Sequence, residues 1–424
     1  MIKALQLHIV EKVKVFHIGL GSFGRYGFEK FVEMNNHFEE VDVELVGVCD
    51  KDFERVENAE KFAESQDLSM DTWESIEQAY KTAERENNED CEILIYDAGP
   101  AEMHADHIYR SLRNNFFHLA EKPPSMTREE HIREKKLMLD NRVRFTVDFI
   151  ERESPVVKKA LELLEEKEIN SIEVFRESTI GVQKLLDPIN RSGVKGGAVM
   201  DKMCHEAYIM DLTAPEKVED VEKEYYMPFS FNGENLMSIR GGKTSEIGSL
   251  TASGAVTAKI SGTADTVLHS SWLGVSSRAR KLSQELEDLT GHNPVNSEFS
   301  TVNEKGLLDE ECRFFVIKGD RDLFTDMLNK KLFDLETGEE IETPSLLHDQ
   351  LYRTLESSVR CAAGLENNSM SEDDIDQFMN LIFDISESNT ENLDVFEQVE
   401  KANNRVSELV LDNVFEAEAV KEEI

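Results

Sequence analysis

The feature that most constrains how this chain can fold is a glycine-rich turn placed directly after a short apolar run. Residues 13–18 read VKVFHI, and residues 19–24 read GLGSFG, a G-x-G-x-x-G pattern. In a strand–turn–helix unit, Gly19 permits a tight turn, Gly21 lets the backbone approach a pyrophosphate, and Gly24 allows the helix to pack closely on the strand. The pattern predicts that N–H groups at the start of this helix bind nucleotide phosphates. A structural turn without a ligand is the alternative.

A carboxylate follows the second strand-like run, where dinucleotide folds bind the adenosine ribose. Residues 45–49 are apolar or small, and Asp50 comes next. An acidic side chain there accepts hydrogen bonds from the ribose hydroxyls and repels a 2′-phosphate, so NAD is favoured over NADP. Lys51 and Arg55 would offset the charge of a 2′-phosphate, which keeps NADP open. For Asp50 itself, a solvated loop aspartate is the alternative.

Strand-like and helix-like segments alternate through the first 150 residues. Repeated βα units of this kind predict a doubly wound parallel sheet. Lys122 follows the strand-like run 116–120, and ligands of such sheets bind beyond the carboxyl ends of the strands. Lys122 is therefore expected where cofactor and substrate meet, with a surface lysine as the alternative. Further strands are expected at 92–97 and 143–147, and helices at 53–65, 72–86, 101–113 and 127–139.

A carboxylate and an imidazole stand four residues apart in the second half of the chain, at Asp201 and His205. If residues 196–212 form a helix, the two side chains share one face. A neighbouring carboxylate raises the pKa of an imidazole and can fix its tautomer, which suits a general base for an alcohol. A helix-surface contact without catalytic meaning is the alternative.

Taken together, four ordered motifs resemble those of the glucose–fructose oxidoreductase, inositol dehydrogenase and rhizopine-catabolism family, called Gfo/Idh/MocA. They are the glycine turn, the acidic end of the second strand, E-K-P at Glu121–Pro123, and G-G-x-x-x-D-x-x-x-H at Gly196–His205. Pro100–His104 also resembles the P-x-x-x-H of the family. Met203 departs from the glycine that many members carry in D-x-G-x-H. By this resemblance, the expected cofactor-binding residues are Gly19, Gly21, Ser22, Phe23, Gly24, Asp50, Pro100, His104, Glu121 and Lys122.

The resemblance implies an α/β protein with an N-terminal Rossmann doubly wound parallel sheet and a C-terminal α/β domain with a largely antiparallel open sheet. The expected domains are 1–150 for NAD(P) binding, 151–365 for substrate binding and oligomerisation, and 366–424 as an acidic helical extension. Apolar residues at helical spacing around Phe378 and Val406 indicate that the extension packs as helices, with a partner-binding tail as the alternative. In the second domain, strand-like runs are expected at 171–176, 218–227, 248–260, 266–273 and 313–317, and a helix at 346–362.

The resemblance also implies an activity, which is hydride transfer between the nicotinamide of NAD or NADP and a secondary alcohol of a sugar or polyol-like substrate. His205 would take the hydroxyl proton, Asp201 would orient and charge-stabilise the imidazole, and Lys122 would stabilise the developing alkoxide. Some family members assign the base to the lysine, so that choice stays open. Arg152 and Lys202 are expected at the substrate. The alternative is a dinucleotide-binding protein without net redox turnover, either an NAD-retaining glycosidase or a regulatory sensor.

Composition argues against several other partners. The formal net charge of −39 disfavours nucleic acid and anionic membrane surfaces, which need a cationic footprint. The five cysteines form no C-x-x-C pair and the histidines show no metal-ligand spacing, so no metal site is expected. No apolar run approaches the roughly 18 residues of a membrane span, and the N-terminus lacks a signal-peptide layout, so a cytoplasmic location is expected. A homo-oligomer, either a dimer or a tetramer, follows from the resemblance alone.

Overall fold

The chain, in its computed structural model, folds into two compact units. Unit 1 comprises the described residues within Met1–Glu153 and Leu346–Asp376, and unit 2 comprises those within Ser154–Ser345 and Gln377–Ile424. The structure describes residues 10–141, 144–178, 197–213, 218–231, 250–272, 274, 276–297, 311–345, 348–366 and 370–388.

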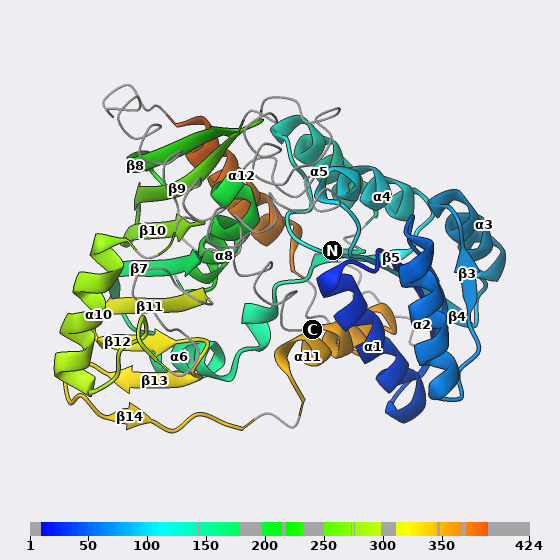
Figure 1. The fold of residues 1–424 in the computed structure, drawn as a ribbon, viewed down its shortest axis with the longest axis horizontal. Coiled ribbons are helices and arrows are strands. Elements are labelled where there is room, and N and C mark those ends of the chain that lie inside the picture. The colour runs from blue at the N-terminus through cyan, green and yellow to red at the C-terminus, as the bar shows by residue number, and fades with distance from the viewer. Residues whose placement is uncertain are drawn as a thin grey trace, which may run out of the picture. The chain divides into compact units, whose positions relative to one another are not determined.

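The division of the chain differs from the expected domain boundaries at 150 and 365, because a late helix belongs to unit 1. Helix α11 (Gln350–Ala362) buries Leu355 and Val359 in the same apolar cluster as Phe31 of helix α1. Figure 1 shows α11 beside α1. The helix expected at 346–362 therefore begins at Gln350, where the side chain of Asp349 accepts a hydrogen bond from a helix N–H group.

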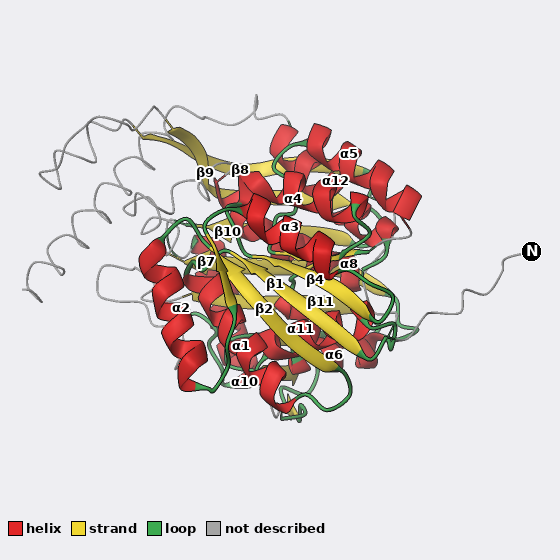
Figure 2. Ribbon diagram, turned by 90° about the vertical axis from the view of Figure 1, so that its right-hand side faces the viewer, coloured by secondary structure: helices red, strands yellow, loops and turns green. Residues whose placement is uncertain are grey.

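A six-stranded parallel sheet forms the centre of unit 1, in the order β3-β2-β1-β4-β5-β6. Figure 2 shows β2, β1 and β4 side by side. The strand order reverses between β1 and β4, which is the switch point where such sheets bind ligands beyond the carboxyl ends. The doubly wound sheet is thereby confirmed. The strands are β1 (Lys12–Ile18), β2 (Asp42–Cys49), β3 (Asp71–Trp73), β4 (Cys91–Asp97), β5 (Phe117–Ala120) and β6 (Phe145–Val147).

Apolar clusters cover both faces of this sheet, because successive residues of a strand point to opposite sides. Val15 of β1 packs in the cluster that contains Phe31 of α1 and Leu355 of α11. The next residue, Phe16, packs in a second cluster with Tyr80 of α3. The other helices of unit 1 are α1 (Ser22–His37), α2 (Phe53–Ser65), α3 (Ile76–Glu86), α4 (Ala101–Arg113), α5 (Arg128–Asn141) and the 3₁₀ helix η1 (Ile150–Glu153).

Side-chain caps decide where two of these helices begin. The helix expected at 72–86 begins later, because its first residues form β3 and the side chain of Ser75 accepts a hydrogen bond from the N–H group of Gln78. Asp52 caps α2 in the same way, accepting from the N–H group of Arg55. The cap on α2 fixes the segment that directly follows the acidic end of β2.

An eight-stranded sheet forms the centre of unit 2, in the order β14-β13-β12-β11-β7-β10-β9-β8 (Figure 1). Strands β7 and β10 pair in parallel, and the other described neighbours pair antiparallel. The expected, largely antiparallel sheet is thereby confirmed, with β12, β13 and β14 in addition. The strands are β7 (Ile169–Ser178), β8 (Asp220–Phe231), β9 (Leu250–Ser261), β10 (Asp265–Ser271), β11 (Glu311–Gly319), β12 (Leu323–Asp326), β13 (Lys331–Asp334) and β14 (Glu340–Ile341). The helices are α6 (Pro155–Leu164), the π-helical segment η3 (Val199–Met203), α8 (Cys204–Thr213) and α10 (Ser277–Thr290).

Helix α12 (Glu372–Glu387) is the described part of the expected acidic extension, and the boundary between the units falls inside it. Its apolar residues are buried, and Phe378 meets the ring of Tyr208 edge-on at a centroid distance of 6.4 Å. A packed helix is therefore confirmed around Phe378, whereas the second apolar group, around Val406, lies outside the described residues. Among the helices that the structure describes, none has the length and apolar character needed to cross a membrane.

Candidate functional site

The glycine turn of unit 1 is closed at two of its glycines and open at the third. A Cβ on Gly19 would lie 2.4 Å from the carbonyl O of Ala98, and one on Gly24 would lie 2.3 Å from the carbonyl O of Gly19. For a Cβ on Gly21, the nearest neighbour would be Nη1 of Arg55, 3.8 Å away. Gly21 directly precedes α1, so the first N–H groups of the helix border this open space. The turn therefore fits the pyrophosphate of a dinucleotide.

His17 supports the turn from the strand side, and sequence reasoning did not single it out. The imidazole is fully buried in β1, and its Nε2–H donates a hydrogen bond of 2.9 Å to the carbonyl O of Gly19. Burial lowers the pKa of His17 to about 4, so the ring is neutral at physiological pH. Ser22 and Phe23 form the first turn of α1, where the Phe23 side chain is 39% exposed.

Asp50 ties the end of β2 to the glycine turn. Its Oδ2 accepts a hydrogen bond of 2.5 Å from the N–H group of Leu20, and its Oδ1 accepts one of 2.8 Å from the N–H group of Asp52. Nε of Arg55 lies 3.3 Å from Oδ2 of Asp52. The acidic group expected at the ribose and a cation close to Gly21 therefore lie at the same end of β2. The preference for NAD over NADP stays a prediction.

Asp97 ends β4 and forms a hydrogen bond with the buried His107 of α4. Its Oδ2 accepts a hydrogen bond of 2.7 Å from Nδ1 of His107, and its Oδ1 accepts one of 3.0 Å from the N–H group of Gly99. Burial alone would raise the pKa of Asp97, but the neighbouring imidazoles, His107 first, hold it well below its usual range. Burial lowers the pKa of His118, on β5, to about 3. The available signal was an aspartate at the carboxyl end of a parallel strand.

His104 connects the loop after β4 with the loop after β5. Its Nδ1 lies 2.9 Å from the carbonyl O of Pro123, and its Nε2 lies 3.0 Å from the carbonyl O of Gly99. Pro100 belongs to the loop after β4 and directly precedes α4. His104 supports the segments that carry Pro100 and Lys122, and a direct contact with the cofactor stays a prediction.

Two carboxyls, those of Glu121 and Asp148, directly follow paired residues at the carboxyl ends of β5 and β6. Asp148 is 2% exposed, and Oε1 of Glu121 is buried as well. The hydroxyl of Tyr96 donates to Oδ2 of Asp148 at 3.3 Å. Burial raises the pKa of Glu121 to about 7, against the opposing effect of Lys122. Burial and the charge of Glu121 raise the pKa of Asp148 well above its usual range.

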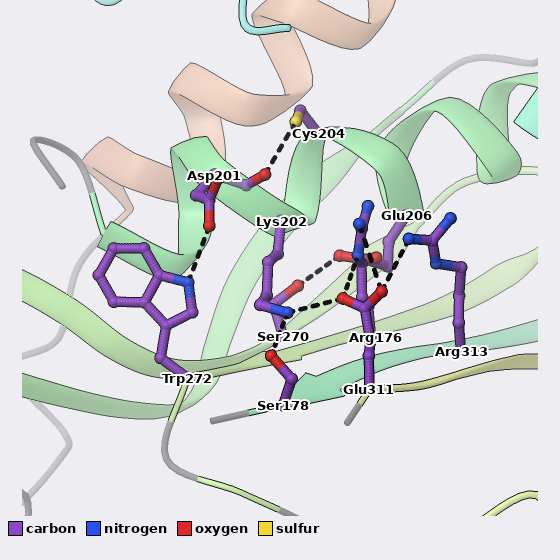
Figure 3. Close-up of polar contacts among 10 residues, drawn as sticks. All are labelled: Arg176, Ser178, Asp201, Lys202, Cys204, Glu206, Ser270, Trp272, Glu311 and Arg313. Carbon is purple, nitrogen blue, oxygen red and sulfur yellow. Dashed lines mark hydrogen bonds and ion pairs between the residues drawn. The ribbon is translucent and has the colours of Figure 1, made fainter. Parts of the chain in front are cut away.

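In unit 2, Asp201 and His205 occupy a helix that begins in a π-helical segment, η3, and continues as α8. Nε1 of the fully buried Trp272 donates a hydrogen bond of 3.0 Å to Oδ2 of Asp201 (Figure 3). His205 is 4% exposed. A π-helical turn is wider than an α-helical one, and such segments are frequent at functional sites. The shared face expected for Asp201 and His205 assumed an α-helix throughout, and it stays a prediction.

Three cations surround one carboxylate between this helix and the sheet (Figure 3). Oε1 of Glu311 lies 2.7 Å from Nζ of Lys202 and 2.8 Å from Nε of Arg176, and Oε2 lies 2.8 Å from Nη2 of Arg313. Burial alone would raise the pKa of Glu311, but the cations, Arg176 first, hold it well below its usual range. Nζ of Lys202 also donates to Oγ of Ser178 at 2.7 Å. Lys202, expected at the substrate, thus takes part in a buried ion cluster.

The register of neighbouring strands brings the residues of this cluster together, and this register could not be predicted from the sequence. Arg176 of β7 lies opposite Arg313 of β11 on one side and Ser270 of β10 on the other. Ser270 donates a short hydrogen bond to Glu206 of α8, and burial raises the pKa of Glu206 to about 8. The cluster therefore combines an ionised carboxylate, Glu311, with a carboxyl that is mostly protonated at neutral pH.

The residues expected at the active site are distributed over both units. Lys122 follows β5 and Arg152 lies in η1, both in unit 1, whereas Asp201 and His205 lie in unit 2. Within unit 1 the structure brings the glycine turn together with the acidic end of β2, as expected. Joint action of Lys122 and His205 on one substrate stays a prediction. Gly196, the first glycine of the second motif, lies outside the described residues.

Comparison with a family model supports the interpretation of unit 1. Residues 13–149 match the model of the Gfo/Idh/MocA family, described as an oxidoreductase family with an NAD-binding Rossmann fold. Among curated proteins, no sequence matches the chain significantly. The resemblance stated from the motifs is confirmed, and so is a cofactor of the NAD or NADP type.

Solved structures share the fold of most of the chain at low sequence identity. UDP-N-acetylglucosamine 3-dehydrogenase GnnA from Acidithiobacillus ferrooxidans aligns at a TM-score of 0.58 and 15% identity, over 89% of this chain and 97% of that one. KijD10, a 3-ketoreductase from Actinomadura kijaniata in complex with TDP-benzene and NADP, aligns at 0.57 and 15%, over 89% and 98%. An oxidoreductase domain protein from Kribbella flavida aligns at 0.59 and 14%, over 93% and 98%. These likenesses confirm the α/β fold class.

Proposed function

We propose that this chain, whose residues 13–149 match the Gfo/Idh/MocA family model, is an NAD(P)-dependent oxidoreductase that oxidises a secondary alcohol of a sugar or polyol-like substrate, or reduces the corresponding ketone. The observation that carries the proposal is the arrangement of the carboxyl edge in unit 1. The open face at Gly21 follows β1, and Lys122 follows β5 on the same edge of the same parallel sheet. A dinucleotide bound across a switch point extends from the glycine turn towards the neighbouring strand ends.

The bound nicotinamide would supply the redox chemistry, as an acceptor or donor of hydride. The phosphates would be held by the N–H groups that begin α1 and the adenosine ribose by Asp50. His205 would remove the hydroxyl proton, Asp201 would orient the imidazole, and Lys122 would stabilise the negative charge that develops on oxygen. The hydrogen bond from Trp272 to Asp201 supports this assignment, because it fixes one oxygen of the carboxylate and limits its rotation.

Two of the structural relatives support a sugar as the substrate class. One is named as a 3-dehydrogenase of UDP-N-acetylglucosamine, and the other as a 3-ketoreductase. Both names describe the interconversion of an alcohol and a ketone. At 15% identity they suggest where to begin a substrate search, so a panel of free sugars, polyols and nucleotide sugars is the appropriate choice.

The test is the absorbance of reduced nicotinamide after the purified protein is mixed with NAD or NADP and each member of that panel. We expect multiple turnovers with at least one secondary alcohol, and a fall in kcat of about 100-fold or more in His205→Ala. If the His205→Ala rate stays within about threefold of wild type, the assignment of the base is wrong. A cofactor that is reduced once and never released would favour a dinucleotide-binding protein without net turnover.

A further inference from the structure

We infer that the carboxyl pair of Glu121 and Asp148 distinguishes oxidised from reduced nicotinamide, because the pair gives up a proton when the cationic, oxidised ring binds. The inference rests on the proposed function, since it takes the reactive ring to lie beyond the carboxyl ends of β4 and β5. It goes further by naming two residues that would set the preference for one redox form. Reduced nicotinamide is neutral and would leave the proton in place.

The geometry of the pair favours one shared proton. Glu121 and Asp148 follow paired residues of neighbouring parallel strands. Their backbones are held in place, because the N–H group of Glu121 donates a 2.8 Å hydrogen bond to the carbonyl O of Asp97 and that of Asp148 donates one of 2.8 Å to the carbonyl O of Ala120. Oε1 of Glu121 and Oδ1 of Asp148 are both buried without a donor among the described residues. Ionised carboxylates can only accept, whereas a proton on either group supplies the missing donor.

The charged and titratable groups around the pair include some that favour ionisation of its carboxyls and some that oppose it. On β4, the hydroxyl of Tyr96 contacts Asp148, and the carboxylate of Asp97 lies near this hydroxyl. Lys122 after β5 and the imidazole of His104 on α4 favour ionisation of Glu121, whereas Glu151 on η1 opposes ionisation of Asp148.

Helix α11 also packs against η1 and β4, and its charged residues Arg353, Glu356 and Arg360 are all half-buried. Arg360 forms ion pairs with Glu40 and Glu366, and Arg353 and Glu356 are opposite in sign. One additional positive charge beside Glu121 and Asp148 would therefore be enough to release the shared proton, because two adjacent buried carboxylates resist ionisation mainly through each other and through burial.

This coupling has a definite sign. The free protein binds the proton, and the complex with the oxidised dinucleotide does not, so affinity for the oxidised form rises with pH. The limiting slope is about one decade in Kd for each pH unit, which corresponds to one proton released per ligand bound. Burial raises the pKa of both carboxyls, so the free pair holds a proton near neutral pH, and NAD⁺ should release a measurable fraction of it. The reduced form should release none, so the ratio of the two affinities depends on pH.

The experiment is titration calorimetry of the full-length protein with NAD⁺ and with NADH, without substrate, in two buffers that differ in ionisation enthalpy. The dependence of the observed enthalpy on the buffer gives the number of protons released. We expect proton release for NAD⁺, up to one proton per ligand bound, and none for NADH near pH 7 in wild type. Equal proton numbers for the two forms would overturn the inference.

Variants identify the group that supplies the proton. The double variant Glu121→Gln, Asp148→Asn should bind NAD⁺ without proton release, whereas Glu134→Gln removes another buried carboxyl of raised pKa, on α5, and should leave the number unchanged. In Lys122→Met the number should rise, because the cation that favours ionisation of Glu121 is lost. Proton release that disappears in Lys122→Met but persists in the double variant would assign the proton to the lysine and overturn the inference.

The inference and the proposed function can fail separately. Different proton numbers for NAD⁺ and NADH, combined with no turnover on any alcohol of the panel, would support the carboxyl pair and contradict the proposed reaction. Turnover on a sugar, combined with equal proton numbers, would do the reverse. The wild-type comparison of NAD⁺ with NADH remains decisive even if the double variant does not fold.

Discussion

The carboxyl edge of unit 1 and the ion cluster of unit 2 are both buried and polar, yet they handle charge in opposite ways. In unit 1, Glu121 and Asp148 lie beside each other, and burial raises the pKa of both. In unit 2, the side chain of Glu311 is only 14% exposed, and burial alone would raise its pKa, but contacts with Arg176 and Lys202 hold it well below the usual range. Burial therefore does not decide the charge of a carboxyl by itself, and the partner within hydrogen-bond distance does.

The two arrangements suit different tasks. Ions that neutralise each other hold two elements together, and in unit 2 they join the helix that carries Lys202 to strands β7 and β11. A carboxyl pair that holds a proton can instead change its charge when a ligand arrives. Glu206 shows that the distinction lies in the local partner, because it belongs to the unit 2 cluster but accepts its hydrogen bond from the neutral hydroxyl of Ser270 and keeps a raised pKa.

The strongest way to break this comparison is to remove the shared carboxylate of unit 2. Glu311→Gln leaves Lys202 and Arg176 without the negative charge that they share, and we expect a loss of about 3–5 kcal/mol in the free energy of unfolding. Urea unfolding of both proteins measures it. The control is Glu285→Gln, an exposed carboxyl on α10, which should change stability by no more than about 0.5 kcal/mol. A loss as small as that of the control would show that the cluster does not hold the helix.

The next largest effect should depend on pH and should have opposite signs at two carboxyls of unit 2. The folded-state pKa of Glu206 is about 8, above the unfolded value, so its stabilising contribution is present at low pH and is lost as pH rises towards 8. Glu206→Gln, which mimics the protonated acid, should gain about 3 kcal/mol relative to wild type between pH 5 and pH 8. Unfolding free energies at several pH values provide the measurement.

Glu311 gives the matched comparison for this experiment. Its folded-state pKa is depressed, so its contribution is present above the unfolded value, near 4.5, and is lost as pH falls below it. The advantage of wild type over Glu311→Gln should therefore shrink in acid, whereas that over Glu206→Gln should shrink in alkali. Parallel pH profiles for the two variants would contradict the assignment of one ionised and one protonated carboxyl.

Features that depend on residues close together in the sequence could be predicted, whereas contacts between residues far apart in the sequence could not. The turn from Gly19 to Gly24 and its relation to Asp50 could be predicted, because glycine requirements and strand ends are local properties. The bond between Lys202 and Glu311 joins residues 109 positions apart, and it depends on the register of β7 with β11, which no local pattern encodes. Asp148 lies between these cases, because a carboxylate at the end of a strand can be recognised in the sequence, but the pairing of β5 with β6 that places it beside Glu121 cannot.

The four-residue spacing of Asp201 and His205 led to the prediction of a shared α-helical face, which stays a prediction. Its premise of a regular α-helix does not hold throughout, because Val199–Met203 form a π-helical segment. The resemblance implies that the helix expected at 346–362 returns to the first domain, and α11 belongs to unit 1 because its apolar stripe completes the cluster around Phe31. Packing between distant segments decided both features.

The smallest expected effect is on dinucleotide affinity at the glycine turn. There a cation, Arg55, rather than a carboxyl borders the open space at Gly21. Arg55 is 28% exposed, pairs with Asp52 and lies 3.8 Å from the position of a Cβ on Gly21. A partly exposed ion pair contributes at most about 1 kcal/mol, so Arg55→Ala should weaken binding of NADP by no more than about fivefold. The affinity for NAD, which lacks the 2′-phosphate, should change less.

Lys61→Ala, which removes an exposed cation further along α2, is the control and should alter neither affinity. Fluorescence titration at two salt concentrations measures these affinities, because screening should reduce the effect of Arg55. Equal weakening of NAD and NADP would instead assign Arg55 to the pyrophosphate that both dinucleotides share.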